Sequence, residues 1–277
     1  MSHYSLVLVG EEEQMFPFSM IGCGIDGEHV REQDVFAYRL TEWHENGCPE
    51  DFRTWLEETY GTPFISPDEE PDVRGKHKFG YARLDENGAI VGVIERDTPN
   101  GKWDGFQLGG RWSDFFLLYS GERTHTAMLK DIDFSGMARG CVEKALLRRA
   151  EVQEVLRRHP PLKLWEDVLR ESKNDTKAAR IAYHEQSAIR ELEEKDLDYD
   201  PEFYVRDNLL VFIKKMTVRG AFPYAFLLNG RWYERGEMHW FGVSDEKISP
   251  KKWYKLCKNR LLSLPPETVL RVYDCHC

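Results

Sequence analysis

Short apolar runs rich in β-branched and aromatic residues stand near both ends of the chain. Residues 4–9 read YSLVLV and stop at Gly10, and residues 268–276 read TVLRVYDCH. Runs of this length and composition, bounded by turn residues, are typical of β-strands. We predict that the first and the last strand enter the same sheet.

Further strand-like runs are separated by tight-turn sequences. Asp85-Glu86-Asn87-Gly88, Pro99-Asn100-Gly101, Gly109-Gly110 and Asn229-Gly230 all contain residues that tolerate positive φ, as hairpin turns require. Because the first three turns follow one another closely, they predict an antiparallel meander. The strands expected around these turns cover residues 78–84, 89–95, 103–108, 111–119 and 222–228, the last returning through Trp232.

The middle of the chain changes to a helical period. From about residue 134, where Asp133 is the expected N-cap, apolar residues recur at steps of three, four and seven. His159-Pro160-Pro161 ends this first helix, and Ser249-Pro250 is a strong start signal for a later one. The other helices are expected at residues 49–60, 163–172 and 175–195, from about 201, and at 249–262.

These elements predict an α+β protein whose antiparallel sheet is built from both chain ends, with helices on one side. Residues 1–133 and 216–277 would form the sheet core, and residues 134–215 a mainly helical insertion. The apolar stripes of the insertion must be buried somewhere. They could pack within the monomer, join two copies into a homo-oligomer, or grip a partner.

Charge and composition narrow the class of protein. The 277 residues carry a formal net charge of −10 and are 13% aromatic, which predicts a folded, acidic and soluble chain. Such a charge disfavours binding to nucleic acid or to anionic membranes. No apolar stretch reaches the roughly 18 residues of a membrane span, and the first residues lack the basic region of a signal peptide.

The cysteines point to a reducing compartment. No CxxC pair is present, and Cys275 and Cys277 are too close in sequence for an ordinary structural bridge. Free thiols, and therefore a cytoplasmic location, are the expectation. The six cysteines are Cys23, Cys48, Cys141, Cys257, Cys275 and Cys277.

Arginine and tryptophan stand side by side after a glycine turn in two segments, 100–116 (NGKWDGFQLGGRWSDFF) and 228–242 (LNGRWYERGEMHWFG). In one interpretation the tryptophans pack in the core and the arginines pair with Asp104 or Glu234. In the other, two guanidinium groups and the indole rings form a floor that binds a small anionic, nucleotide-like ligand. The candidate ligand-binding residues are Arg111, Trp112, Arg231, Trp232, Trp103, Asp104 and Trp240.

A second candidate site joins the two chain ends. Asp274 and His276 are two apart on the last strand, so they share a face, and His3 could join them if the terminal strands pair. The three could bind one metal ion. His3-Tyr4-Ser5 also has the H-x-S form of two-histidine phosphoesterases, but a second motif of this form on a paired strand is missing. Satisfied polar side chains near chain ends are the commoner situation.

Several of these segments, taken in order, resemble an uncharacterised family encoded mainly by bacteriophages and prophages. The resemblance rests on MSHYSLVLVG, KWD…LGGRW, DIDFSGM, NGRWYERGEMHWFG and the closing VYDCH. It covers both flanking blocks, whereas the helical middle is only loosely similar and residues around 82–98 are additional. The resemblance implies a phage-type accessory protein in the host cytoplasm and brings no catalytic mechanism with it.

The usual enzyme signatures are missing from the sequence. It has no Walker-type phosphate loop, no G-x-G-x-x-G after a strand, no H-E-x-x-H and no G-x-S-x-G, and no motif identifies a cofactor. Together with the resemblance, this favours a non-enzymatic protein that binds a host macromolecule, for example to inhibit an anti-phage defence system. The alternatives are the small-anion binder and a metal-dependent phosphoesterase or hydrolase.

Overall fold

The computed structural model describes residues 2–21, 29–197, 201–238, 244–245 and 247–277, and these form two compact units. The first unit comprises Met1–Ser113, Ala225–Asp245 and Leu270–Cys277, and the second Asp114–Tyr224 and Glu246–Val269. Sheets and helices of both units confirm the α+β class. The helix α9 (Pro250–Arg260) belongs to the second unit with the middle helices, so the units divide the chain differently from the predicted core and insertion.

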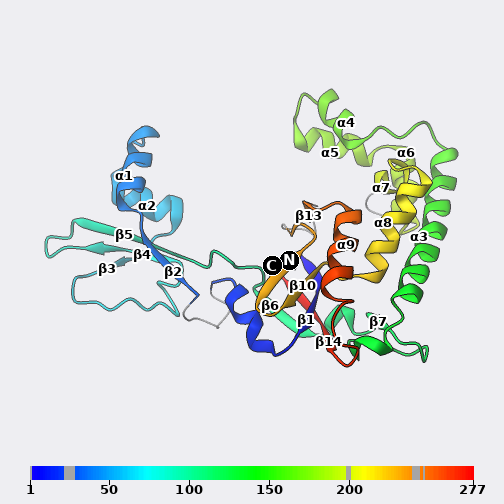
Figure 1. The fold of residues 1–277 in the computed structure, drawn as a ribbon. Coiled ribbons are helices and arrows are strands. Elements are labelled where there is room, and N and C mark those ends of the chain that lie inside the picture. The colour runs from blue at the N-terminus through cyan, green and yellow to red at the C-terminus, as the bar shows by residue number, and fades with distance from the viewer. Residues whose placement is uncertain (1, 22–28, 198–200, 239–243, 246) are drawn as a thin grey trace. The chain divides into compact units, whose positions relative to one another are not determined.

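The main sheet of the first unit contains both terminal strands. β1 (His3–Val9) and β14 (Val269–His276) pair antiparallel from His3 opposite His276 to Val9 opposite Leu270, as predicted. The strand order is β11-β10-β1-β14-β6, with β10 at Ala225–Leu228, β11 at Arg231–Glu234 and β6 at Gly105–Leu108. Figure 1 shows β1 in blue beside the red β14.

In the main sheet, the pair of β1 and β10 differs from the predicted antiparallel arrangement. β10 runs parallel to β1, with Leu6 opposite Ala225 and Val9 opposite Leu228. Parallel neighbours need a long connection, and most of the chain lies between these two strands. Leu6, Val7 and Leu8 are all buried, which is the pattern of a strand covered on both faces.

The predicted meander is wrong beyond its first hairpin. β4 (Gly80–Leu84) and β5 (Ile90–Asp97) pair antiparallel, but β6 leaves for the main sheet and pairs with β14. Residues 111–119 are not one strand. Gly109 and Gly110 have φ of 73° and 50°, which turn the chain into a short 3-10 helix, η2 (Gly110–Trp112), before β7 (Phe116–Leu117).

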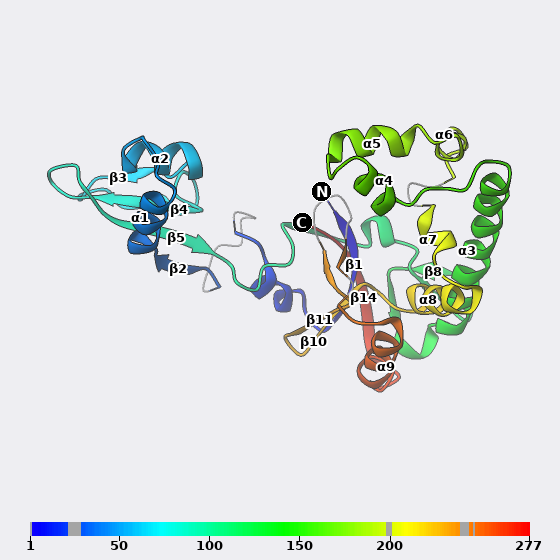
Figure 2. The same cartoon turned by 90° about the horizontal axis from the view of Figure 1, so that it is seen from above.

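β4 and β5 form a second, four-stranded sheet in the order β2-β5-β4-β3, with β2 at Arg31–Asp34 and β3 at Phe64–Ile65. Helices α1 (Phe36–Glu45) and α2 (Phe52–Tyr60) lie on one face of it (Figure 2). Asp51 caps α2 by accepting bonds from the amides of Arg53 and Thr54, so the helix starts after the predicted Pro49.

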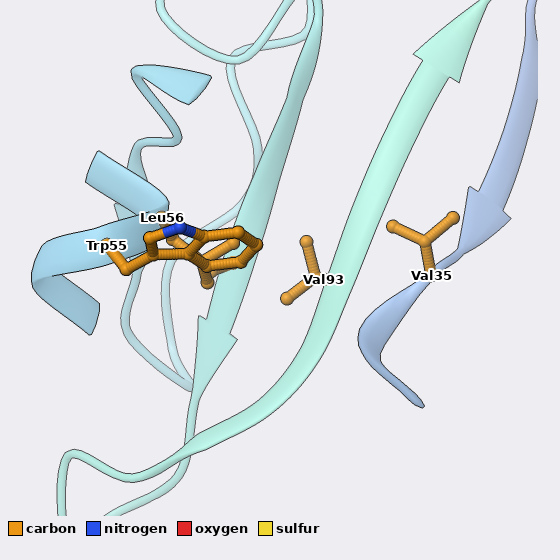
Figure 3. Close-up of a cluster of buried hydrophobic side chains, with 5 residues drawn as sticks. Val35, Trp55, Leu56 and Val93 are labelled. Carbon is orange, nitrogen blue, oxygen red and sulfur yellow. The ribbon is translucent and has the colours of Figure 1, made fainter. Parts of the chain in front are cut away.

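Side chains of the helix α2, of the strands β4 and β5 and of the residue after β2 form the hydrophobic core of this second sheet. Figure 3 shows Trp55 and Leu56 of α2 directed at the sheet, where Val93 and Val35 meet them. Gly61 ends α2 in the left-handed conformation, with φ of 60°. The second sheet therefore has a hydrophobic core of its own.

The second unit is mainly helical. α3 (Phe134–Arg157) is capped by Asp133, whose side chain accepts from the amide of Gly136 at 2.8 Å. It packs on α8 (Leu209–Ala221) at Gly220, where a Cβ would lie 2.3 Å from Cys141 Cβ. The predicted helix 175–195 is two helices, α5 (Thr176–His184) and α6 (Ser187–Glu194). The remaining elements are η1 (Glu12–Phe18), η3 (Leu129–Asp131), α4 (Trp165–Glu171), α7 (Glu202–Val205), β8 (Arg123–Thr124), β9 (Thr126–Met128), β12 (Glu237–Met238) and β13 (Ser244–Asp245).

The described residues can be compared with two expectations from the sequence, the lack of a membrane span and the free cysteine thiols. None of the helices in these residues is both long and apolar enough to cross a bilayer. The five cysteines that can be described are all free thiols, and Cys23 lies outside the described residues. Burial raises the pKa of the Cys275 thiol well above its ordinary value.

Tyr273 on β14 gives a prediction at alkaline pH. Burial, and then the hydrogen bond from its hydroxyl to Glu12 at 2.9 Å, raise its pKa above the ordinary value of about 10. A raised folded-state pKa stabilises the protein fully below pH of about 10, and this contribution is lost as pH rises towards the folded-state value. Urea unfolding between about pH 9 and 11 should therefore show a steeper loss of stability for the wild type than for Tyr273→Phe, and equal slopes would contradict this.

Candidate functional site

The paired ends of β1 and β14 bring two histidines together. His3 lies opposite His276, and their rings are 5.4 Å apart between centroids and tilted by 43°. Backbone bonds between Ser2 and Cys277 extend the pairing by one more residue, at 3.1 and 3.2 Å. The predicted meeting of the terminal side chains therefore occurs.

Asp274 holds the first of these histidines. Its side chain is 7% exposed, and its Oδ1 accepts a hydrogen bond from His3 Nδ1 at 2.8 Å. Its Oδ2 accepts from the backbone amide of Arg111 at 3.1 Å. Both carboxylate oxygens are thus engaged within the protein.

A glycine permits this arrangement. Gly110 has φ of 50°, and a Cβ at that position would lie 2.5 Å from Asp274 Cβ. A side chain there would push the turn away from the carboxylate. The amide that binds Asp274 is consequently held in place by the Gly109-Gly110 turn.

Asp104 holds the second histidine. Nδ1 of His276 lies against Asp104 Oδ1, and the amide of Asp104 donates to the carbonyl of His276 at 2.8 Å. The His276 ring lies over Gly105, where a Cβ would come within 2.3 Å of Nε2. We define His3, Asp104, Asp274 and His276 as the terminal cluster.

The predicted three-ligand metal site does not form as expected. Asp274 is not available as a third ligand beside His3 and His276, because its Oδ1 accepts from His3 Nδ1 and its Oδ2 from the amide of Arg111. Within the described parts of the chain, no group of three or more His, Cys, Asp or Glu side chains could hold a metal ion. Asp274 orients a histidine instead.

The first arginine–tryptophan segment is built differently from the predicted ligand floor. Arg111 lies in the turn η2 with its side chain exposed, and it contributes a backbone amide to the terminal cluster. Trp103 is 1% exposed, and its Nε1 donates to the carbonyl of Met15 at 3.2 Å. Trp103 therefore offers no free face for stacking, and Trp112 is half-buried.

The second segment lies at another part of the main sheet. Arg231 pairs with Leu228, and Leu228 pairs with Val9. Val9 is the last residue of β1, and His3 is the first. The Trp232 ring packs on Phe18 at 5.0 Å, and Glu234 binds Lys102 rather than Arg231. The two arginines thus do not converge. Trp240 lies outside the described residues.

A feature that sequence patterns did not single out is the charge of residues 31–97, which we call the acidic lobe. This segment contains 16 Asp and Glu against 8 Lys and Arg, so it carries −8 of the chain's net charge of −10. It contains the whole second sheet with α1 and α2. Counting charges segment by segment would have revealed it from the sequence.

The acidic lobe also exposes large aromatic side chains. Tyr38, Tyr60 and Phe79 are 64%, 41% and 60% exposed. The guanidinium group of Arg39 lies over the Tyr60 ring at 3.9 Å. Tyr60 and Phe79 line a cavity of about 210 Å³ together with Arg39 and Lys76.

No family model, no curated protein and no solved structure matches the chain. The resemblance to phage-encoded proteins therefore stays a prediction from sequence motifs.

Proposed function

We propose that this chain is a non-enzymatic binding protein whose acidic lobe recognises a basic surface on a partner protein. The observation that carries the proposal is the concentration of net charge, −8 of −10, in residues 31–97. Complementary charge accelerates association and selects among partners. An acidic surface of this kind fits a basic face and repels nucleic acid and anionic lipid.

The exposed aromatic residues support a protein partner. Tyrosine and phenylalanine are enriched at the centres of protein interfaces, where charged groups form the rim. Tyr60 and Phe79 both line the cavity described above, within the charged lobe. They supply the apolar contact area that charge alone does not.

The motif resemblance supplies the biological setting of the proposal. For a phage-type accessory protein, the partner would be a host protein, including a component of an anti-phage defence system. Proteins that act on nucleic acid have basic faces that neutralise phosphates. The acidic lobe would bind to such a basic face and would compete there with nucleic acid.

The small-anion alternative required Arg111 and Arg231 to share one site. Their positions at different ends of the main sheet remove that support, as does the burial of Trp103. The binding protein is therefore the function that we carry forward.

The proposal is tested by neutralising charge in the acidic lobe. Asp68→Asn, Glu69→Gln and Glu70→Gln change three exposed side chains of one loop. We expect the combined variant to keep its fold and to recover about tenfold less partner from host lysate than the wild type, because complementary charge is lost. Quantitative mass spectrometry of the captured proteins measures this.

A matched control changes the same charge in the second unit. Glu143→Gln, Glu185→Gln and Glu267→Gln also neutralise three exposed carboxylates. This variant should capture the same partner at the wild-type level. Equal capture by all three proteins, or a partner whose binding does not weaken with added salt, would contradict the proposal.

A further inference from the structure

We infer that His3 and His276 form a two-histidine site for a divalent transition-metal ion of the zinc, nickel or copper type, bound through the Nε2 atom of each ring. The terminal cluster lies in the main sheet, so the inference does not depend on the partner-binding role of the acidic lobe. It differs from the site expected from the sequence because Asp274 orients a ligand and is not one itself.

The first step of the argument is the tautomer of His3. An ionised carboxylate only accepts hydrogen bonds, so the bond between Asp274 Oδ1 and His3 Nδ1, 2.8 Å long, places a proton on Nδ1. In the neutral ring the lone pair is then on Nε2. Nε2 is the atom that remains for a metal ion.

The second step is the matching environment of His276. Its Nδ1 lies against Asp104 Oδ1, so this ring also turns its Nδ1 towards a carboxylate. Histidines that bind metal ions almost always have their other ring nitrogen on a carboxylate or carbonyl, which fixes the ring and raises its basicity. In the terminal cluster His3 makes this hydrogen bond, and His276 has its Nδ1 in contact with the Asp104 carboxylate without a regular hydrogen bond.

The third step concerns the distance between the two rings and their exposure to solvent. Zinc lies about 2.0–2.1 Å from a histidine nitrogen, so two ligating Nε2 atoms come within roughly 4 Å of each other. Ring centroids 5.4 Å apart and tilted by 43° are compatible with that separation. The side chains of His3 and His276 are 21% and 32% exposed, so both rings are partly accessible to solvent.

Because no third side chain of the described residues completes the coordination, water would occupy the other positions. Such a site is weaker than a closed structural zinc site. It links β1 to β14 directly, since each strand contributes one ligand. Metal binding would therefore stabilise the pairing of the terminal strands.

The test uses tag-free, full-length protein with ZnCl₂, NiCl₂ or MgCl₂. At a metal concentration about ten times the dissociation constant, we expect Zn²⁺ and Ni²⁺ to raise the melting temperature by about 3 °C, and Mg²⁺ to leave it unchanged because imidazole is a poor Mg²⁺ ligand. Chelation by EDTA should reverse the shift. Calorimetric titration should give one ion per chain.

The decisive variants are His3→Gln and His276→Gln, each of which should abolish the shift and the calorimetric signal. His44→Gln, which removes an exposed histidine of α1, should behave as the wild type. Asp274→Asn should weaken binding about 10- to 100-fold, because it disturbs the orientation of His3. Circular dichroism checks that both histidine variants are folded. The inference would be overturned if the wild type gave no heat of Zn²⁺ or Ni²⁺ binding, or if both folded variants bound the ions as the wild type does.

Discussion

Trp103→Ala is expected to lower the free energy of unfolding by about 4 kcal/mol. The indole is 1% exposed, and it packs edge-on against Phe106, with 4.7 Å between ring centroids. Truncation removes this contact, leaves a cavity, and deprives the Met15 carbonyl of its donor. Urea denaturation followed by circular dichroism measures the loss.

Trp103→Phe separates the contributions of the ring and of the hydrogen bond. It keeps an aromatic ring beside Phe106 but loses the bond to Met15 and part of the buried ring, so a smaller loss of about 1–2 kcal/mol is expected. If Trp103→Ala unfolded at the wild-type denaturant concentration, the indole would not be a core residue, and its earlier interpretation as a stacking surface for a ligand would return.

Asp274→Ala should cost about 3 kcal/mol of stability. The substitution leaves the Nδ1 proton of His3 and the amide of Arg111, both partly buried, without the carboxylate that accepts from them. The measurement is again urea denaturation, and hydrogen exchange should show faster exchange of the Arg111 amide in the variant. Loss of this one carboxylate thus affects both β1 and the turn after β6.

Asp97→Ala is the matched control for Asp274→Ala. Asp97 also pairs with a cation, Arg31, at 2.8 Å, but both side chains are more than half exposed. Solvent screens such a pair, and we expect a change of about 0–1 kcal/mol. Equal losses for the two variants would mean that the burial of Asp274 does not set its contribution.

Elements defined by local patterns were predicted well from the sequence. The apolar run of residues 4–9, the Asn229-Gly230 turn and the Ser249-Pro250 helix start each depend on a few neighbouring residues, and the structure contains β1, the β10–β11 hairpin and α9 at these places. The long helix after Asp133 follows from its periodicity in the same way.

Choices between distant partners were not predictable from local patterns. β6 follows β5 in sequence but pairs with β14, and β10 lies parallel to β1. A turn sequence shows that the chain reverses, but it does not show which strand receives the next one. The helix α1 was missed because none of its residues is fully buried and its apolar face is short.

The terminal cluster was predicted in part. The two-residue spacing of Asp274 and His276 and the expected pairing with β1 brought the right side chains together. Their roles depend on the backbone around Gly105 and Gly110, which places Asp104 and the amide of Arg111 against them. That geometry comes from two glycine positions whose neighbours in space are 160 or more residues away in sequence.

The pairing of β1 with β14 has a consequence for how the protein folds during synthesis. β1 precedes its antiparallel neighbour β14 by the acidic lobe and by the described helices of the second unit, so β14 is translated much later. The apolar side chains of Leu6, Val7 and Leu8 therefore stay without this strand as a packing partner while the rest of the chain is synthesised. We therefore expect the second sheet, whose strands are close in sequence, to form cotranslationally, and the main sheet to close last and slowly.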